Sequence, residues 1–153
     1  MAPIRRPTTF AMALVLTASV AAAAEAQGSR SVAVILDASG SMKAPLPDGK
    51  TRMAAAKVAV AEFANGLAAD TRVALWAYGH QSPTSKKDCK DTSLLTPFAT
   101  TSQNKAAIIA QARALEPQGY TPITYSLTLA ARGLDHEESA TRTIVLVSDG
   151  KET

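Results

Sequence analysis

The sequence predicts an α/β fold: a doubly wound, mostly parallel sheet with helices on both of its faces. Two apolar runs rich in β-branched residues, 31–36 and 143–147, are typical of strands buried on both faces. Amphipathic helical patterns lie between them, and this alternation indicates a parallel sheet. The 153 residues suffice for one domain, and 46% hydrophobic with 19% charged residues is a globular composition.

The first half of the domain follows from the hydrophobic pattern along the chain. After the strand at 31–36, a loop is expected at 43–51, where two prolines and a glycine interrupt regular structure. A helix is predicted over 52–69, because its apolar residues recur on one face with helical spacing. A second strand is predicted at 71–78, and the polar segment 79–91 is expected to be a loop.

The second half continues the alternation. A short third strand around 94–98 is expected to form a hairpin with the second, and a helix is predicted over 105–115. Thr121 is expected to cap a further helix, with Pro122 as its first residue. The buried face of this helix is predicted to contain Ile123, Leu127, Ala130, Ala131 and Leu134. The last strand, 143–147, is apolar enough to be buried on both faces.

The N-terminal residues 1–26 have the pattern of a secretory signal peptide, which leaves 27–153 as the domain. Two arginines precede an apolar stretch, 10–24, and a small-x-small cleavage site follows at 24–26. A membrane anchor is the alternative, but the stretch is shorter than the roughly 20 residues of a span. We therefore expect export to the periplasm or the extracellular space, with no membrane span after cleavage.

Charge and cysteine content exclude several classes of protein. The net charge of +3 is dispersed, and an aspartate interrupts the one basic cluster, at 86–90, so nucleic-acid binding is not expected. The single cysteine, Cys89, excludes a disulfide-rich miniprotein and a Cys-rich zinc module.

Oxygen-bearing side chains follow the two buried strands and begin one helix. Asp37, Ser39 and Ser41 form a D-x-S-x-S pattern after the first strand, and Asp149 follows the last strand. Ligands of such sheets bind outside the carboxyl ends of the strands, and Mg²⁺ prefers oxygen ligands in an octahedron. The sequence therefore predicts a divalent cation site formed by Asp37, Ser39, Ser41, Thr121 and Asp149.

Each of these residues also has a purely structural explanation. Aspartates form turns at strand ends, and serines form turns or cap helices. For Thr121 the structural explanation is that it caps its helix and binds no metal. Other aspartate-led loops fit the sequence less well. Met42 stands where an EF-hand loop requires glycine, and Ser39 stands where a phosphatase D-x-D loop requires aspartate.

These motifs resemble the von Willebrand factor type A domain, and the resemblance covers most of residues 30–153. The D-x-S-x-S, T-P and S-D-G motifs, in this order, correspond to the family's metal-ion-dependent adhesion site. The D-G-x-E-T ending is similar to that of exported bacterial members. The matching pieces are VILDASGSM (34–42), the helix that begins near Arg52, TRVALWAYG (71–79), GYTPI (119–123), SLTLA (126–130) and IVLVSDGKET (144–153).

The resemblance implies a Rossmann-like fold and a role for each site residue. Ser39 and Ser41 would bind the metal directly, Thr121 directly or through water, and Asp37 and Asp149 mostly through water. A partner protein would supply an Asp or Glu to the open position. Mg²⁺ or Mn²⁺ is expected, with Ca²⁺ less favoured by such small ligands. The implied function is a metal-dependent protein-binding module of the cell envelope, not an enzyme.

The family's fold usually continues with further helices and two more strands, so the resemblance implies that the last strands are missing here. A sheet order of 3-2-1-4 would then leave the strand at 143–147 as an exposed edge. Related exported members often carry a cysteine soon after D-G-x-E-T. Cys89 is therefore expected to pair with a cysteine outside this chain.

Two other functions stay open: a structural domain with an unused metal site, and a metal-assisted hydrolase. A hydrolase requires a base beside the metal, and neither His80 nor His136 adjoins the motif loops. A zinc site at His80 and Cys89 matches no standard spacing. The connector at 136–138 is expected to be solvated, and Trp76 is expected in the core.

Overall fold

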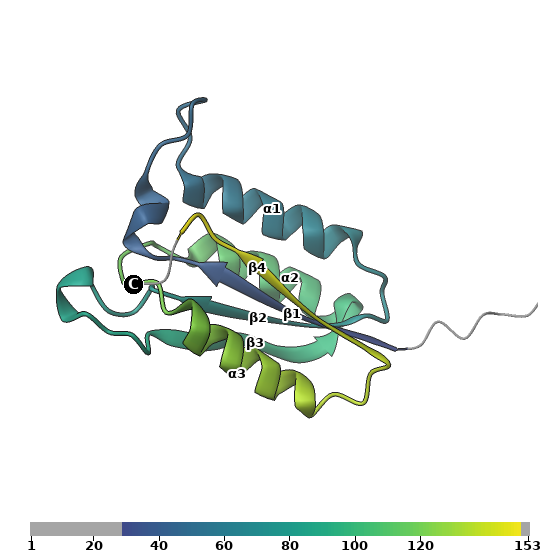
Figure 1. Cartoon of the computed structure of the whole chain (residues 1–153). Helices are drawn as coiled ribbons and strands as arrows, with labels where there is room; N and C mark the ends of the chain where they lie inside the picture. Colours follow the sequence, from purple (N-terminus) through teal and green to yellow (C-terminus); the bar gives the residue numbers. More distant parts are fainter. Residues whose placement is uncertain (1–28, 151–153) are drawn as a thin grey trace, which may run out of the picture.

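The computed structural model describes residues 29–150, whose strands form one four-stranded sheet (Figure 1). The order is β3-β2-β1-β4; β1 runs parallel to β2 and β4, and β3 runs antiparallel to β2. The predicted mostly parallel sheet and its hairpin are thus confirmed. The strands are β1 (Arg30–Asp37), β2 (Arg72–Tyr78), β3 (Thr92–Thr100) and β4 (Thr141–Val147).

The helices cover both faces of the sheet (Figure 1). The helices α1 (Arg52–Gly66) and α2 (Thr101–Ala114) pack on one face, and α3 (Ile123–Asp135) packs on the other. Two short 3-10 helices, η1 (Gly40–Lys43) and η2 (Thr84–Lys86), lie in the loops after β1 and β2. No helix among the described residues is long and apolar enough to cross a membrane, and the predicted signal peptide lies outside this part of the chain.

Side chains of the two central strands alternate between the two hydrophobic cores. Val34 and Leu36 face α1 and α2, whereas Ile35 and Trp76 face α3. Trp76 packs edge-to-face on Phe98 of β3, with ring centroids 5.5 Å apart. The expectation that Trp76 belongs to the core is confirmed.

Several helix boundaries differ from the prediction. The helix α1 ends at Gly66 rather than 69, and α3 begins at Ile123, one residue later than predicted. The start of α2 lies four residues before the predicted one, because buried Thr101 donates both its backbone N–H and its hydroxyl to the carbonyl of Thr71. This polar anchor leaves no hydrophobic signal in the sequence.

The buried face of α3 is partly different from the prediction. Ala130 and Leu134 are buried as predicted, whereas Ala131 is exposed. Ser126 is buried instead. Its burial is tolerated because its hydroxyl forms hydrogen bonds with the carbonyl of Pro122 at 2.7 Å and with the hydroxyl of Thr92 at 2.8 Å.

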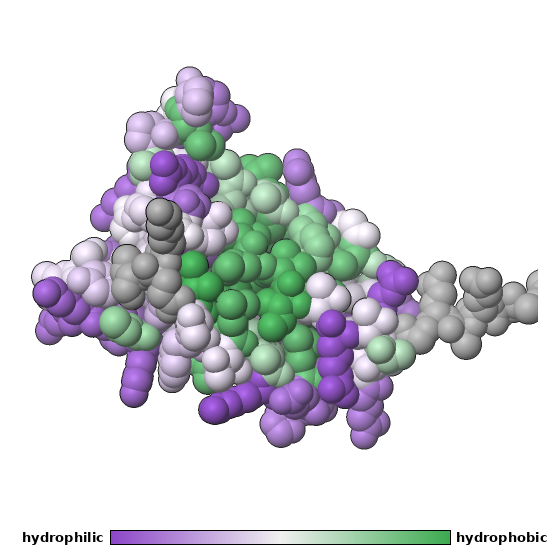
Figure 2. All heavy atoms as spheres, in the orientation of Figure 1, coloured by the Kyte–Doolittle hydropathy of each residue, from purple (hydrophilic) through white to green (hydrophobic). Residues whose placement is uncertain are grey.

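The prediction from composition that 143–147 is fully buried was wrong, whereas the expected 3-2-1-4 order, with this strand at the edge, is confirmed for the described residues. The strand β4 is an edge of the described sheet, so it is only partly covered, and Leu146 keeps 36% of its surface exposed. Figure 2 shows hydrophobic side chains gathered on the face of the molecule over β4, between α1 and α3. The apolar composition correctly predicted a strand, but it did not predict how much of that strand other elements bury.

The connector after α3 is also less solvated than expected. Glu137 is 8% exposed and accepts hydrogen bonds from Ser31 at 2.9 Å and from the Arg72 guanidinium. The hydroxyls of Ser31 and Ser139 are 2.6 Å apart. This buried polar cluster fixes the start of β4 against β1, at the end of the sheet opposite the predicted site.

Candidate metal centre

The loop after β1 is shaped by the buried carboxylate of Asp37. Its Oδ1 accepts a hydrogen bond from the backbone N–H of Ser39 at 2.7 Å, which closes a tight turn. Asp37 therefore has the turn-forming role that the sequence left open, and it also lies at the carboxyl edge of the sheet. Its two roles do not exclude each other, because a carboxylate has several lone pairs.

Backbone pairing joins this loop to the segment before α3. Ser39 forms a parallel bridge with Gly119, and the N–H of Gly40 donates to the Gly119 carbonyl at 2.9 Å. On the other side, the N–H of Gln118 donates to the carbonyl of Ala38 at 3.0 Å. Thr121 comes two residues after Gly119, so this pairing brings it to the same edge of the sheet.

Two glycines permit the close approach of these loops. Gly79 has φ of 69°, and a Cβ on it would lie 2.5 Å from the carbonyl oxygen of Tyr120 and 2.8 Å from Cα of Ser39. A Cβ on Gly119 would lie 2.5 Å from the carbonyl oxygen of Ser82. Side chains at either position would push the site loops apart.

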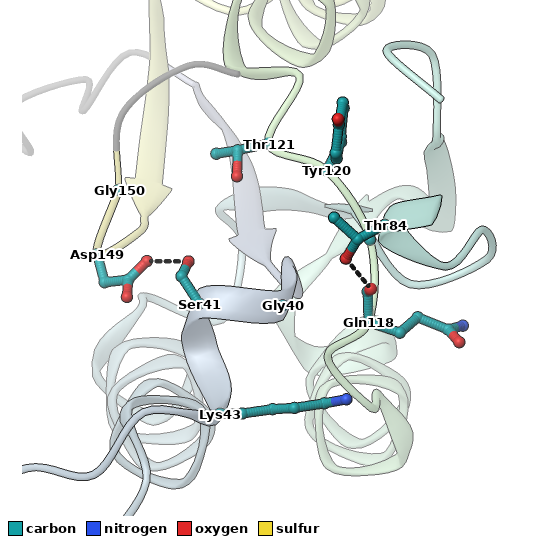
Figure 3. A pocket seen from close by; sticks show the side chains of 10 residues that line it. Gly40, Ser41, Lys43, Thr84, Gln118, Tyr120, Thr121, Asp149 and Gly150 are labelled. Carbon is teal, nitrogen blue, oxygen red and sulfur yellow. Dashed lines mark hydrogen bonds between the residues drawn. The ribbon is translucent and has the colours of Figure 1, made fainter. Parts of the chain in front are cut away.

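Ser39, Ser41 and Asp149 form a continuous chain of oxygens. The two serine hydroxyls are 3.0 Å apart, and the Ser41 hydroxyl donates to Oδ1 of Asp149 at 2.9 Å. Figure 3 shows this last contact, with Thr121 lining the same cleft. The other carboxylate oxygen of Asp149 pairs with the guanidinium of Arg52, at the start of α1.

A second chain of hydrogen bonds holds Asp37 from β4. Ser148 donates to Oδ2 of Asp37 at 2.7 Å and accepts from the Tyr78 hydroxyl at 3.1 Å. Burial raises the pKa of the Tyr78 phenol, so it keeps its proton and serves as a donor. A Cβ built on Gly150 would lie 3.8 Å from the Thr121 methyl and 3.9 Å from Oδ2 of Asp37, so Gly150 lies close to both residues.

The structure therefore brings the five predicted residues to one place. Ser41, Thr121 and Asp149 line a cleft of about 490 Å³, together with Lys43 and the half-buried Tyr120 (Figure 3). Ser39 and Asp37 lie beneath it, 1% and 0% exposed.

The donors fit a small, hard cation. An octahedron with metal–oxygen bonds of about 2.1 Å has neighbouring oxygens about 3.0 Å apart. The hydroxyls of Ser39 and Ser41, the two residues expected to bind directly, already lie 3.0 Å apart. Asp149, expected to act through water, accepts the Ser41 hydroxyl at 2.9 Å and orients it. Among the described residues, no three or more His, Cys, Asp or Glu side chains cluster as metal ligands would. Hydroxyls supply most of the donors here, and they suit Mg²⁺ or Mn²⁺ better than softer metals.

The other candidates from the sequence lie elsewhere. His80 is in the loop between β2 and β3, its Nδ1 3.9 Å from Oδ1 of Asp91, and burial lowers its pKa. Cys89 is exposed in the same loop, and its pairing with an outside cysteine stays a prediction. His136 follows α3 at the opposite end of that helix from Thr121.

Two residues that support the site were not assigned a role from the sequence. Ser148 is the serine of the S-D-G motif, but only Asp149 of that motif was assigned to the site. Arg52 has one signal: a cation at the first position of a helix opposes the helix dipole and therefore suggests a partner.

The fold and the site define a doubly wound α/β domain with an oxygen-lined cleft at the carboxyl edge of its sheet. The chain belongs to the von Willebrand factor type A domain family, whose model matches residues 32–152. It is 30% identical to the uncharacterized protein YwmC of Bacillus subtilis over 132 residues and 31% identical to YwmD over 144 residues. These alignments cover 84% and 90% of this chain, but only 58% and 64% of the two relatives.

Solved structures share the fold. The von Willebrand factor domain of the type V pilus tip protein Mfa5 from Porphyromonas gingivalis aligns with a TM-score of 0.63 and 24% identity, over 82% of this chain and 39% of that one. The PilB minor pilin of Streptococcus sanguinis aligns with a TM-score of 0.68 and 21% identity, over 82% and 31%. The pilus adhesin SpaC of Lactobacillus rhamnosus GG aligns with a TM-score of 0.66 and 21% identity, over 82% of this chain and 16% of that one.

Proposed function

We propose that this domain is a protein-interaction module that binds its partner through a divalent cation. Asp37, Ser39, Ser41, Thr121 and Asp149 would hold the cation, with Mg²⁺ or Mn²⁺ preferred. The observation that carries the proposal is the chain of three oxygens at 3.0 and 2.9 Å that joins the β1 loop to the β4 loop.

The charges around the site favour an anionic partner. Both carboxylates of the set are already engaged: Asp37 accepts two hydrogen bonds, and Asp149 pairs with Arg52. The remaining donors are neutral hydroxyls, so a bound cation would keep much of its charge and would attract an anionic oxygen at its open position. An Asp or Glu of another protein supplies such an oxygen.

The cleft itself agrees with an acidic partner. Among the described residues that line it, Asp149 is the one carboxylate and Lys43 the one side-chain cation (Figure 3). Because Arg52 pairs with Asp149, no unpaired negative charge of the lining opposes an approaching carboxylate. Lys43 would add attraction at the edge of the cleft.

We also propose that the domain acts outside the cytoplasm and catalyses no reaction. The structural relatives include a pilus tip protein, a minor pilin and a pilus adhesin. The signal-peptide pattern of residues 1–26 supports export. No described histidine contacts the oxygen chain, so nothing favours a hydrolytic base there.

The proposal is tested by calorimetry and NMR on the full chain. Mg²⁺ is titrated into the wild type and Thr121→Val, which removes the hydroxyl at constant shape; Thr128→Val on the exposed side of α3 is the control. Binding by the wild type and the control, but not by Thr121→Val, is expected. Equal binding by all three would exclude Thr121 as a ligand.

The partner's chemistry is tested with a short capped peptide carrying one central Glu and with its Gln counterpart. We expect chemical-shift changes at Ser39 and Thr121 only with the Glu peptide and only in Mg²⁺. Changes that persist in EDTA, or are equal for the Gln peptide, would contradict recognition through a metal.

A further inference from the structure

We propose that Arg52 is a positioning residue of the metal centre, which holds the Asp149 carboxylate in the orientation that the site requires. This inference rests on the proposed function and extends it to a residue outside the five candidate ligands. It also explains how the loop after β4 is fixed to the loop after β1.

The two oxygens of Asp149 have different partners. Oδ1 accepts the hydroxyl of Ser41 at 2.9 Å, and Oδ2 accepts the guanidinium of Arg52. The carboxylate is therefore clamped from both sides and cannot rotate without losing a charged hydrogen bond. The side chain of Asp149 is only 11% exposed, whereas that of Arg52 is 39% exposed.

Arg52 occupies a place that the helix alone does not favour. It is the first residue of α1, where the helix dipole opposes positive charge, and the first turn contains no acidic residue. Thr51 caps the helix instead, by accepting the N–H of Ala54 at 3.1 Å. Nothing within α1 stabilises the guanidinium, so its interaction with Asp149 accounts for its position.

The backbone between the site and α1 places Arg52 and Ser41 on one preformed loop. Pro45 and Thr51 form an antiparallel bridge, and the N–H of Arg52 donates to the carbonyl of Ala44 at 3.0 Å. Ser41, in η1, and Arg52, at the start of α1, therefore approach Asp149 from the two ends of this bridged loop. The two groups that orient the carboxylate are thus linked through one closed segment of backbone.

Two effects of the guanidinium on a cation oppose each other. Its charge repels the cation, but the side chain is partly exposed, and water and salt screen that repulsion. Its hydrogen bond orients a carboxylate that forms no other ion pair within residues 29–150. Groups that orient metal ligands in this way typically contribute about 10–100-fold to metal affinity. Orientation therefore outweighs repulsion, and Arg52 strengthens metal binding.

The experiment compares the Mg²⁺ dissociation constants of four full-length proteins by calorimetry, at a temperature where each is folded. Arg52→Met should bind Mg²⁺ about 10-fold more weakly. Arg52→Lys keeps the charge but not the planar fork, so a smaller loss is expected. The control is Lys57→Met, which removes another ion pair of α1, 3.5 Å from Glu116 and remote from the oxygens. It should bind like the wild type.

Each outcome decides between two proposals. Wild-type affinity in both Arg52 variants, or tighter binding in either, would overturn the positioning role while leaving the metal centre intact. A wild type that binds no Mg²⁺ would instead overturn the metal centre. A role confined to stability would lower the metal-free melting temperature of Arg52→Met without changing its dissociation constant. If Arg52→Met does not fold, wild-type affinity in Arg52→Lys overturns the inference by itself.

Discussion

Ser148 donates a hydrogen bond to the buried carboxylate of Asp37 over 2.7 Å and thereby joins the ends of two neighbouring strands, β4 and β1. The hydroxyl of Tyr78, at the end of β2, donates to the same serine. Three adjacent strands are therefore connected by side chains at the edge where the cleft lies. The loop after β4 is thus held to the ends of β1 and β2 by side-chain hydrogen bonds.

Ser148→Ala should lower the free energy of unfolding by about 1–3 kcal/mol. The substitution leaves Oδ2 of Asp37 and the hydroxyl of Tyr78 without this partner in a partly buried place, and an unsatisfied buried polar group is destabilising by that amount. Urea unfolding of the metal-free chain measures the change. Ser85→Ala, at an exposed loop residue, is the matched control and should behave as the wild type.

The Glu137 cluster should make stability depend on pH in the acidic range. The hydrogen bond from Arg72 is the main cause that lowers the pKa of Glu137 below its ordinary 4.5, and Ser31 adds to it. Because the folded pKa is the lower one, this stabilisation is fully present above about pH 4.5. It is lost as the pH falls through the folded value.

Glu137→Gln should therefore destabilise the domain at pH 7, and its stability should approach that of the wild type as the pH falls below 4.5 and through the folded pKa of Glu137. Chemical unfolding at a series of pH values measures the difference. Glu138→Gln changes the exposed neighbour and should give no such trend. A constant difference from pH 7 to pH 3 would mean that the ionised carboxylate is not what stabilises the cluster.

Gly133→Ala should destabilise the domain although alanine is the better helix former. A Cβ at this position of α3 would lie 2.9 Å from the Trp76 ring, and overpacking of a core typically costs about 1–3 kcal/mol. Gly66→Ala, at the last residue of α1, is the matched control because nothing lies within 4 Å of its Cβ position. Thermal unfolding should show a lower melting temperature for Gly133→Ala than for Gly66→Ala. Equal melting temperatures in the two variants would mean that the Trp76 ring moves aside freely.

Much of the fold could be predicted from the sequence, for physical reasons that particular elements illustrate. The run at β1 is apolar and β-branched because both of its faces are covered, and the pattern shows this directly. The same composition in β4 led to a wrong prediction of burial. An apolar composition shows that a strand tolerates burial, whereas its actual exposure depends on which strands and helices lie beside it.

The candidate site was predictable in position because parallel strands bring their carboxyl ends to one edge. Asp37 is the last residue of β1, Asp149 follows the adjacent strand β4, and the β1 loop pairs with the segment before Thr121. The partners of these residues were not predictable. Arg52 contacts Asp149, and Ser148 contacts both Asp37 and Tyr78; these contacts join distant parts of the chain and leave no periodicity or spacing in the sequence.

The central claim, that the five oxygen-bearing residues form a divalent cation site, is tested most directly by thermal unfolding of the full chain in millimolar Mg²⁺ and in EDTA. Binding at about 100 times the dissociation constant adds about 2.7 kcal/mol, which raises the melting temperature of a domain of this size by several degrees. We predict this rise for the wild type and for Ser85→Ala, and its loss in Ser39→Ala. A cooperative transition at the same temperature in Mg²⁺ and EDTA, or an equal rise in Ser39→Ala, would contradict the claim.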